Sequence, residues 1–246
     1  MTYSRTPIEL AFVMTRNSVE LEETNMASTT GQRSSRSSKS SAGGRRQDYI
    51  DAAARVFYRR GYDTATVGDI AEELDVTKAA LYYYFASKEE LLYEIIREMH
   101  VINLENLESA KALVGDAQTR LWNYFVGHIQ VNLEFFEKST VVYTDLDHLS
   151  AENRQEVVAL RDKTQQFVRD LLAEAVAEGT ACTKANLDLA SIAMFTTANA
   201  VHNWYHPDGQ LKPVEAARRM ADYVVAGISC TGESDLSCPR HNPRVS

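Results

Sequence analysis

The chain has 246 residues, with 26 Lys and Arg against 34 Asp and Glu, and a formal net charge of −8 at pH 7. This balance excludes a protein that coats nucleic acid through general positive charge, and no apolar run approaches the ~20 residues of a membrane-spanning helix. The odd cysteine count fits neither a disulfide framework nor a metal-ligand spacing, so we expect a cytoplasmic protein; the cysteines are Cys182, Cys230 and Cys238.

Residues 1–45 have the composition of a disordered leader. The stretch 28–46 is rich in Ser, Thr and Gly, and its charged residues are all basic. Such a segment cannot bury enough apolar surface to fold alone, and no signal peptide is apparent. Met14 and Met26 are alternative start residues. A second interpretation is an arm that follows the minor groove or the phosphates of DNA.

Residues 46–92 are predicted to form a small head of three short helices followed by the start of a longer one. Apolar residues recur at helical spacing in 50–57, and Gly61 ends that helix because glycine adopts the left-handed conformation without penalty. Asp69 and Glu90 follow two capping residues at the spacing of a capping box. The residues predicted to cap a following helix are Thr66, Thr77 and Ser87.

The second and third helices are separated by a tight turn at Asp75, an arrangement that presents the third helix to the major groove of DNA. Alanines let the backbone approach the bases, lysines reach guanine or phosphate, and hydroxyls suit phosphate oxygens. The alternative is that the aromatic run 82–85 is only a core cluster. The residues predicted to contact DNA are Thr66, Thr77, Lys78, Ala79, Ala80, Tyr82, Tyr83 and Lys88.

The charge of the head limits how it can bind. Residues 45–88 contain seven basic and seven acidic side chains. General electrostatic attraction to phosphates is therefore weak, and recognition must come from the fit of the third helix to the groove.

This head resembles the N-terminal domain of TetR/AcrR-type transcriptional regulators over residues 46–92. The resemblance is carried by Thr66, by Ile-Ala at 70–71, by Leu-Tyr-Tyr-Tyr-Phe at 81–85 and by Ser-Lys-Glu-Glu-Leu at 87–91. It implies an all-α, ligand-responsive, DNA-binding repressor that contacts DNA through the positions named above. Two positions depart from the family pattern, each in a way that affects the DNA-binding region.

The first departure is Asp75, which stands where glycine is usual and must adopt a left-handed conformation, as Asp is able to do. The second is Gly68, which stands where many relatives carry a charged residue that contacts bases. A base contact from the second helix is therefore not expected.

Residues 93–228 are predicted to form a larger helical domain for ligand binding and dimerisation, and residues 229–246 a disordered tail. We find no strand-like alternation long enough to indicate a sheet. Gly115, Gly179 and the Pro-Asp-Gly turn at 207–209 separate the helices. The predicted helices span 88–110, 117–138, 150–178, 186–206 and 212–228, with a short link at 141–148.

The helix at 186–206 is apolar nearly all round, so both of its sides must be covered. One side can close the core of the monomer while the other meets a second copy, with the helix at 212–228 beside it. In TetR relatives this pair of helices forms the dimer interface, which implies a homodimer that reads a palindromic operator. A single-chain bundle is the alternative.

The aromatic residues of the larger domain together indicate a sizeable apolar cavity, the usual site of a lipophilic ligand. The segment 203–211, together with 143–145 and 160–163, resembles acyl-CoA-responsive TetR regulators of fatty-acid and sterol breakdown. That resemblance implies an acyl-CoA effector whose phosphate or carboxylate pairs with Arg161. Alternatively, 204–209 simply ends a helix. The predicted ligand-binding residues are Trp122, Phe125, Tyr143, Arg161, Trp204 and Tyr205.

Two other functions remain open. A regulator of the same fold could respond to another hydrophobic small molecule or to a protein partner, and a filled core would favour the latter. A metal-dependent enzyme is the remote alternative, suggested by Asp145, Asp147 and His148. The sequence has no phosphate-binding glycine loop and no nucleophile motif, so we predict no catalytic residue, no metal and no cofactor.

Overall fold

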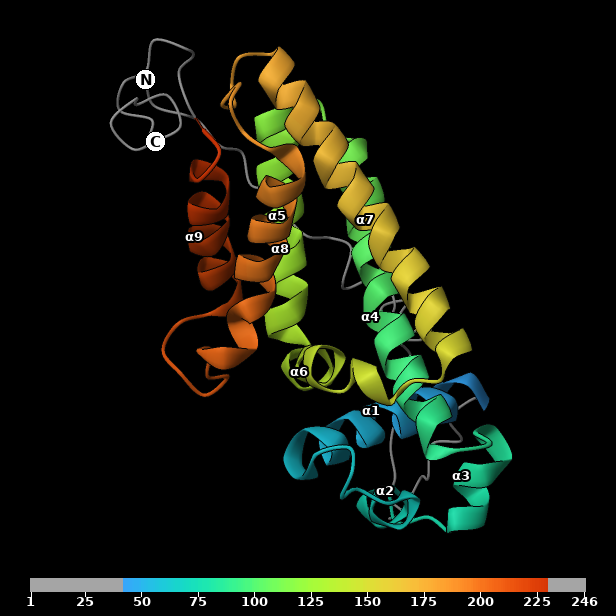
Figure 1. Ribbon diagram of the computed structural model, residues 1–246. Helices are drawn as coiled ribbons and strands as arrows, with labels where there is room; N and C mark the ends of the chain where they lie inside the picture. The colour runs from blue at the N-terminus through green and yellow to red at the C-terminus, as the bar shows by residue number, and fades with distance from the viewer. Residues whose placement is uncertain (1–41, 230–246) are drawn as a thin grey trace, which may run out of the picture. The chain divides into compact units, whose positions relative to one another are not determined.

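The computed structural model describes residues 42–229, and within that range every long element is a helix (Figure 1). The all-α prediction is confirmed, since the only β feature there is an isolated bridge between Ala181 and Ser229. The expected leader up to residue 41 and the expected tail from residue 230 lie outside the described residues. No described helix is both long and apolar enough to cross a membrane.

The head consists of α1 (Ala42–Arg60), α2 (Val67–Glu73) and α3 (Lys78–Tyr84). The larger domain comprises α4 (Lys88–Lys111), α5 (Ala117–Glu134), α6 (Phe136–Thr144), α7 (Ala151–Ala177), α8 (Leu187–Asn199) and α9 (Pro213–Ala226), with 3-10 turns η1 (Leu146–His148) and η2 (Ala200–Asn203). Helix α1 begins before residue 46, where we placed the start of the head.

The predicted capping residues begin the helices of the head. The hydroxyl of Thr66 accepts a hydrogen bond from the backbone of Asp69, whose carboxylate accepts from the backbone of Thr66 at 2.8 Å. The Thr66 hydroxyl also donates to the Asp69 carboxylate at 2.7 Å, and this bond, followed by the bond from the Thr66 backbone, holds the pKa of Asp69 below its usual value. The hydroxyls of Thr77 and Ser87 cap α3 and α4 by accepting from the backbone of Ala80 and Glu90, and the Glu90 carboxylate accepts from the backbone of Ala86 and not from that of Ser87. Helix starts were therefore predictable from local chemistry.

The core of the head continues into the larger domain. Ile50 and Phe57 of α1, Ile70 of α2 and Leu81 of α3 are fully buried. They belong to one hydrophobic cluster that also includes Val141 of α6. Burying apolar surface across this junction stabilises the contact between the head and α6.

The turn between α2 and α3 contains Asp75 in the predicted left-handed conformation, with φ 52°. The backbone N–H of Val76 donates to the carbonyl of Ala71, and that of Asp75 donates to the carbonyl of Glu72. This pattern is a Schellman motif, in which the left-handed residue is usually glycine.

We expect Asp75→Gly to raise the free energy of unfolding by roughly 0.5–1 kcal/mol, because it removes the steric cost of a left-handed L-residue. Urea unfolding followed by circular dichroism measures the change. Glu72→Gly, inside α2, is the control and is expected to lower stability by about 1 kcal/mol. A loss of stability in Asp75→Gly would show that the Asp75 side chain stabilises the turn.

Two predicted helix boundaries are wrong. The helix expected at 117–138 ends at Glu134, and α6 begins after Phe135, whose φ and ψ are −102° and 46°. The hydroxyl of Ser139 donates to the carbonyl of Asn132 and satisfies it where the helix is broken. The helix expected at 186–206 likewise ends at Asn199 and continues as η2.

Candidate functional sites

Helix α3 presents most of its predicted DNA-contacting residues to solvent. Tyr82 and Tyr83 are 53% and 82% exposed, whereas Leu81 and Phe85 are buried. Lys78, Ala79, Thr77 and Thr66 are exposed as well, and Ala80 is half-buried. The aromatic run is therefore divided between the surface and the core.

Gly68 makes room for the side chain of Lys78. A Cβ atom added to Gly68 would lie 2.6 Å from Cε and 2.9 Å from Nζ of Lys78, and 3.3 Å from the hydroxyl oxygen of Thr66. The ammonium of Lys78 thus lies against the start of α2, beside the Thr66 hydroxyl. An ammonium and a hydroxyl placed together suit a phosphate oxygen, so this position favours backbone contact over base contact for Lys78.

We expect Gly68→Ala to weaken DNA binding about as much as Lys78→Ala, because the new methyl group takes the place of the lysine side chain. The fold should be unaffected, since only the flexible end of a side chain must move. The slope of log affinity against log salt concentration should become less steep by about 1.8, because a dimer loses one phosphate contact in each of its two heads. Fluorescence anisotropy on DNA selected from a random pool measures both quantities.

The double variant Gly68→Ala/Lys78→Ala is the control for this prediction. If the alanine at 68 acts by displacing Lys78, it adds no further loss when Lys78 is already absent. Additive losses would instead indicate that Gly68 itself approaches the DNA.

Lys88 lies in a different environment from the other predicted DNA contacts. Its ammonium donates to the carbonyls of Tyr62 at 2.8 Å and Ala65 at 3.0 Å, and lies 4.0 Å from the centre of the Tyr62 ring. These contacts join α4 to the loop that precedes α2. A phosphate contact by Lys88 stays a prediction, and its observed contacts are structural.

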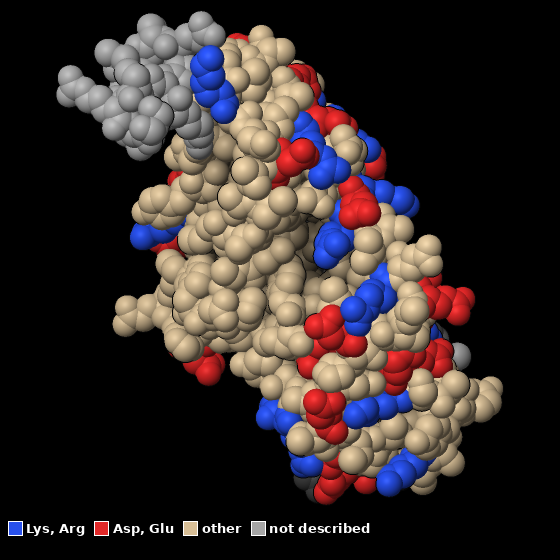
Figure 2. Space-filling model, viewed as in Figure 1, with Lys and Arg blue, Asp and Glu red and all other residues tan. Residues whose placement is uncertain are grey.

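Charges on the head are mixed, as its composition predicts. Arg55 and Arg59 pair with Glu73, and Arg60 pairs with Asp69. Basic and acidic side chains are interspersed on the face shown in Figure 2. Pairing with carboxylates reduces the attraction of these arginines for phosphate, which leaves α3 as the main candidate DNA-contacting surface.

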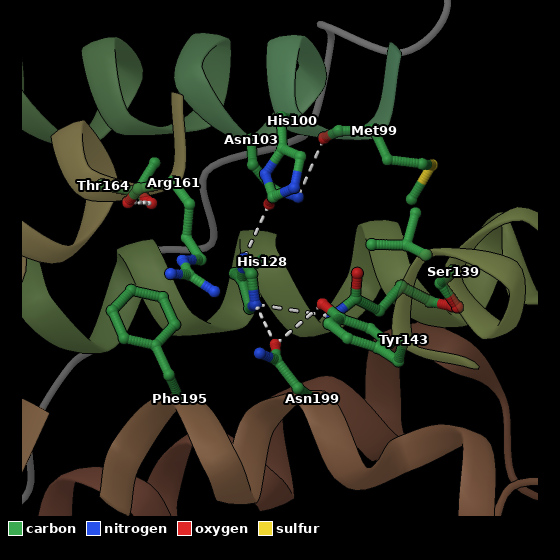
Figure 3. A pocket seen from close by; sticks show the side chains of 12 residues that line it. Met99, His100, Asn103, His128, Ser139, Tyr143, Arg161, Thr164, Phe195 and Asn199 are labelled. Atoms are coloured by element: carbon green, nitrogen blue, oxygen red, sulfur yellow. Dashed lines mark hydrogen bonds between the residues drawn. The ribbon is translucent and has the colours of Figure 1, made fainter. Parts of the chain in front are cut away.

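The larger domain contains a cavity of about 50 Å³ between α4, α5, α6, α7 and α8 (Figure 3). Most of the side chains that line it carry a polar group, and none of them is Asp or Glu. The lining residues are Met99, His100, Asn103, His128, Asn132, Ser139, Val142, Tyr143, Arg161, Thr164, Phe195 and Asn199.

A hydrogen-bond network crosses this cavity (Figure 3). Nδ1 of His128 lies 2.7 Å from Oδ1 of Asn103, and Nε2 lies 2.7 Å from Oδ1 of Asn199. The hydroxyl of Tyr143 donates to Oδ1 of Asn199 at 2.9 Å and accepts from Nδ2 of Asn132 at 3.3 Å. The network joins α4, α5, α6 and α8 through polar atoms.

The titratable residues of the cavity are electrically neutral at pH 7, apart from Arg161. Burial lowers the pKa of His128 to about 4. Burial, followed by the positive charges of His128 and Arg161, lowers the pKa of His100 to about 4. Burial also raises the pKa of the Tyr143 phenol, so it keeps its proton.

Two of the six predicted ligand-binding residues, Tyr143 and Arg161, line this cavity. The structure does not bring the other four to it. The indole of Trp122 donates to Asp222 on α9, and the Tyr205 hydroxyl donates to the carbonyl of Leu211. Phe125 is fully buried, and Trp204 is 38% exposed.

The cavity of the larger domain is smaller than the sizeable apolar cavity that the aromatic residues predicted, and several of those aromatic residues pack against one another. The rings of Phe125 and Phe167 pack edge-on against Tyr124, and Phe195 lies against both Tyr124 and Phe125. Such packing fills space in a hydrophobic core. Sequence reasoning also missed His100, Asn132 and Asn199. The signal that could have found them is the presence of polar residues on helices that are otherwise largely apolar.

The segment at 203–211 forms η2 and the turn that follows it. Within that turn, the backbone N–H of Gly209 donates to the carbonyl of His206 at 2.8 Å. Its predicted alternative role, ending a helix, matches this geometry. No residue of this segment lines the cavity between α4 and α8, so the part of the chain that resembles acyl-CoA-responsive regulators does not contact it.

The residues considered for a metal site make other contacts. The ring of His148 lies at a tilt against that of Tyr62 and 3.9 Å from Asp145, and Asp147 pairs with Arg154. Across residues 42–229, no three His, Cys, Asp or Glu side chains gather as a metal ion would require.

Comparisons with known proteins assign both parts of the chain. Residues 50–95 match the family "Bacterial regulatory proteins, tetR family", and residues 114–228 match "Tetracyclin repressor-like, C-terminal domain". The transcriptional repressor KstR2 of Mycolicibacterium smegmatis is 28% identical over 190 residues, covering 75% of this chain and 91% of KstR2.

Solved structures give the same result. The TetR-family regulator PfmR of Thermus thermophilus is 31% identical, with a TM-score of 0.68, covering 72% of this chain and 97% of PfmR. AibR in complex with isovaleryl coenzyme A and operator DNA shares the fold at 21% identity and a TM-score of 0.66, covering 75% of this chain and 98% of AibR.

Proposed function

Because the chain belongs to the TetR family of bacterial transcriptional regulators, which bind DNA and are not enzymes, we propose that it is a dimeric repressor released from a palindromic operator by an acyl-coenzyme A. The relative KstR2 is a repressor, and AibR was crystallised with isovaleryl coenzyme A and operator DNA. Arg161, at the cavity, offers a guanidinium to a phosphate or a carboxylate of such an effector.

The observation that carries this proposal is the position of α6 between the cavity and the head. Ser139 and Tyr143 of α6 line the cavity. The neighbouring Lys138 is buried, and its ammonium lies 2.5 Å from a carboxylate oxygen of Asp51 in α1 and 2.9 Å from one of Glu98 in α4. A ligand that displaces α6 would change the contacts of α1, and through them the orientation of the head.

Exposed apolar residues support the dimer. Helix α8 buries Met194 and Ala198 against the core but leaves Leu189 64% and Ile192 49% exposed. On α9, Tyr223 is 74% exposed. An apolar surface shared by adjacent helices suits a self-complementary interface between two copies.

We expect acyl-CoA thioesters to release the protein from its own promoter DNA in gel-shift titrations. Asp51→Asn should bind the thioester with the same affinity but require more of it to release DNA, because Lys138 then pairs with Glu98 alone. Asp48→Asn, on an exposed face of α1, is the matched control and should behave like the wild type. A panel in which no thioester releases DNA or raises the melting temperature would overturn the proposal.

A regulator that responds to a protein partner is the second candidate, favoured by the small volume of the cavity. In that case no CoA thioester would bind, whereas promoter binding by α3 would be unchanged. The same titrations therefore separate the two functions.

A further inference from the structure

The cavity also indicates what kind of acyl group it accepts. We propose that it binds a short acyl group ending in a free carboxylate, which lies between Arg161 and a His128 that becomes protonated when the ligand binds. This inference rests on the proposed acyl-CoA effector and names the chemical class of its acyl group.

An acceptor oxygen lies 2.7 Å from each ring nitrogen of His128, and the donor Nδ2 of Asn132 lies farther from Nε2, at 3.4 Å. Nδ2 of Asn103 donates to the carbonyl of Met99, which directs its Oδ1 to the ring at 2.7 Å. On the other side, Oδ1 of Asn199 lies 2.7 Å from the ring. Only the protonated imidazolium can donate to two acceptors at once, because neutral imidazole has a single N–H.

The orientation of the Asn199 amide is set by Tyr143. The Tyr143 hydroxyl accepts from Nδ2 of Asn132, so its own proton is directed to Oδ1 of Asn199. Rotating the Asn199 amide would place a donor against that hydroxyl, which would then face two donors and have no acceptor for its proton. In this arrangement of the amides, the oxygen of Asn199 is directed at His128.

The lining of the cavity contains no carboxylate. Burial without a negative partner keeps His128 neutral, with a pKa of about 4, although its geometry suits the cation. The titratable groups around it are His100 of α4, Tyr124 of α5, Tyr143 of α6 and Arg161 of α7, and none is an acid. Helix α8 contributes only neutral side chains to the lining. An anion in the cavity would stabilise the protonated ring.

Arg161 places a guanidinium at the cavity that can bind an anion. Its guanidinium is directed toward His128 and Phe195 in Figure 3 and forms no ion pair within residues 42–229. A guanidinium binds a carboxylate through two parallel hydrogen bonds. A cavity needs roughly 10–15 Å³ of such space to hold one water molecule, so a cavity of about 50 Å³ holds a few groups of that size, enough for a carboxylate and a short acyl chain. A sterol ring or a long alkyl chain does not fit this volume.

The test compares thioesters that differ only at the end of the acyl group. Glutaryl-CoA and adipyl-CoA end in a carboxylate, whereas 5-methylhexanoyl-CoA and 6-methylheptanoyl-CoA replace it with an isopropyl group of the same shape. Isothermal titration calorimetry at pH 6 in two buffers of different ionisation enthalpy gives the affinity and the number of protons taken up. In the pair whose chain length binds better, we expect the carboxylated thioester to bind about tenfold tighter or more than its isopropyl counterpart. A charge-assisted bidentate pair with Arg161 requires a difference of this size.

We also expect binding of the carboxylated thioester to take up close to one proton, and its affinity to fall as the pH rises toward the pKa of the bound His128. Arg161→Gln, at an exposed position, should lose the preference for the carboxylate. Asn199→Asp supplies a carboxylate to His128 within the protein and should abolish both the preference and the proton uptake.

Equal or tighter binding of the isopropyl thioesters, or binding of the carboxylated ones without proton uptake, would overturn this inference while leaving the acyl-CoA effector in place. If neither kind of thioester binds, the proposed effector is wrong and the inference fails with it.

Discussion

The variant Lys78→Ala/Tyr82→Ala is expected to lose operator binding by about 100-fold or more while remaining folded and dimeric. Both side chains are exposed on α3, and Tyr82 is 53% exposed, so their removal leaves no cavity. If α3 is the helix that enters the groove, as proposed, each head loses an ammonium and a phenol from it, and the proposed dimer loses them twice. Gel shift with the chain's own promoter measures the affinity, and circular dichroism measures the fold.

Two single changes serve as controls for this prediction. Tyr82→Phe keeps the ring and removes only the hydroxyl, so it separates a phosphate contact from an apolar contact with a thymine methyl group. Lys163→Ala removes an exposed lysine from α7 in the larger domain and should leave the affinity unchanged. Unchanged operator affinity in the double variant would show that α3 is not the helix that binds the groove.

Much of the head was predictable because its signals are local in sequence. Thr66, Thr77 and Ser87 cap the helices that they precede, and each acts within three residues. The left-handed turn at Asp75 follows from the same short-range geometry. The helix-turn-helix could therefore be located without knowledge of tertiary contacts.

The break at Phe135 could not be predicted in this way. It contains neither glycine nor proline, and the residues that accompany it act through distant parts of the chain. Lys138 turns to Asp51 and Glu98, which lie far away in sequence. Tertiary ion pairing and the bond from Ser139 to Asn132 decide where α6 begins, so periodicity alone extended the preceding helix too far.

The cavity shows a second limit of sequence reasoning. Aromatic residues predicted a large apolar pocket, but the same residues pack equally well against one another, as Tyr124 and Phe125 do. The polar network is assembled from α4, α5, α6 and α8. Its central residue, His128, looks in sequence like any buried histidine, and only the positions of Asn103 and Asn199 distinguish it.

The variant Leu189→Glu/Ile192→Glu is expected to be monomeric and to lose operator binding. Both residues are exposed on α8, at 64% and 49%, so the charges are tolerated in the monomer. In a self-complementary interface, each change appears twice and places like charges against an apolar surface, where an unpaired charge is costly. Light scattering coupled to size exclusion measures the mass, and gel shift measures binding to a palindromic site.

The matched control is Val114→Glu, which adds the same charge at a valine that is 101% exposed in the loop between α4 and α5. This variant should remain dimeric and bind DNA normally. The monomeric α8 variant should still bind an acyl-CoA, since Leu189 and Ile192 do not line the cavity. On DNA that contains a single half-site, the α8 variant and the Val114→Glu control should bind equally weakly. The palindrome gains its affinity by holding two heads at a fixed spacing. A dimer that persists with both glutamates would move the interface away from this face of α8.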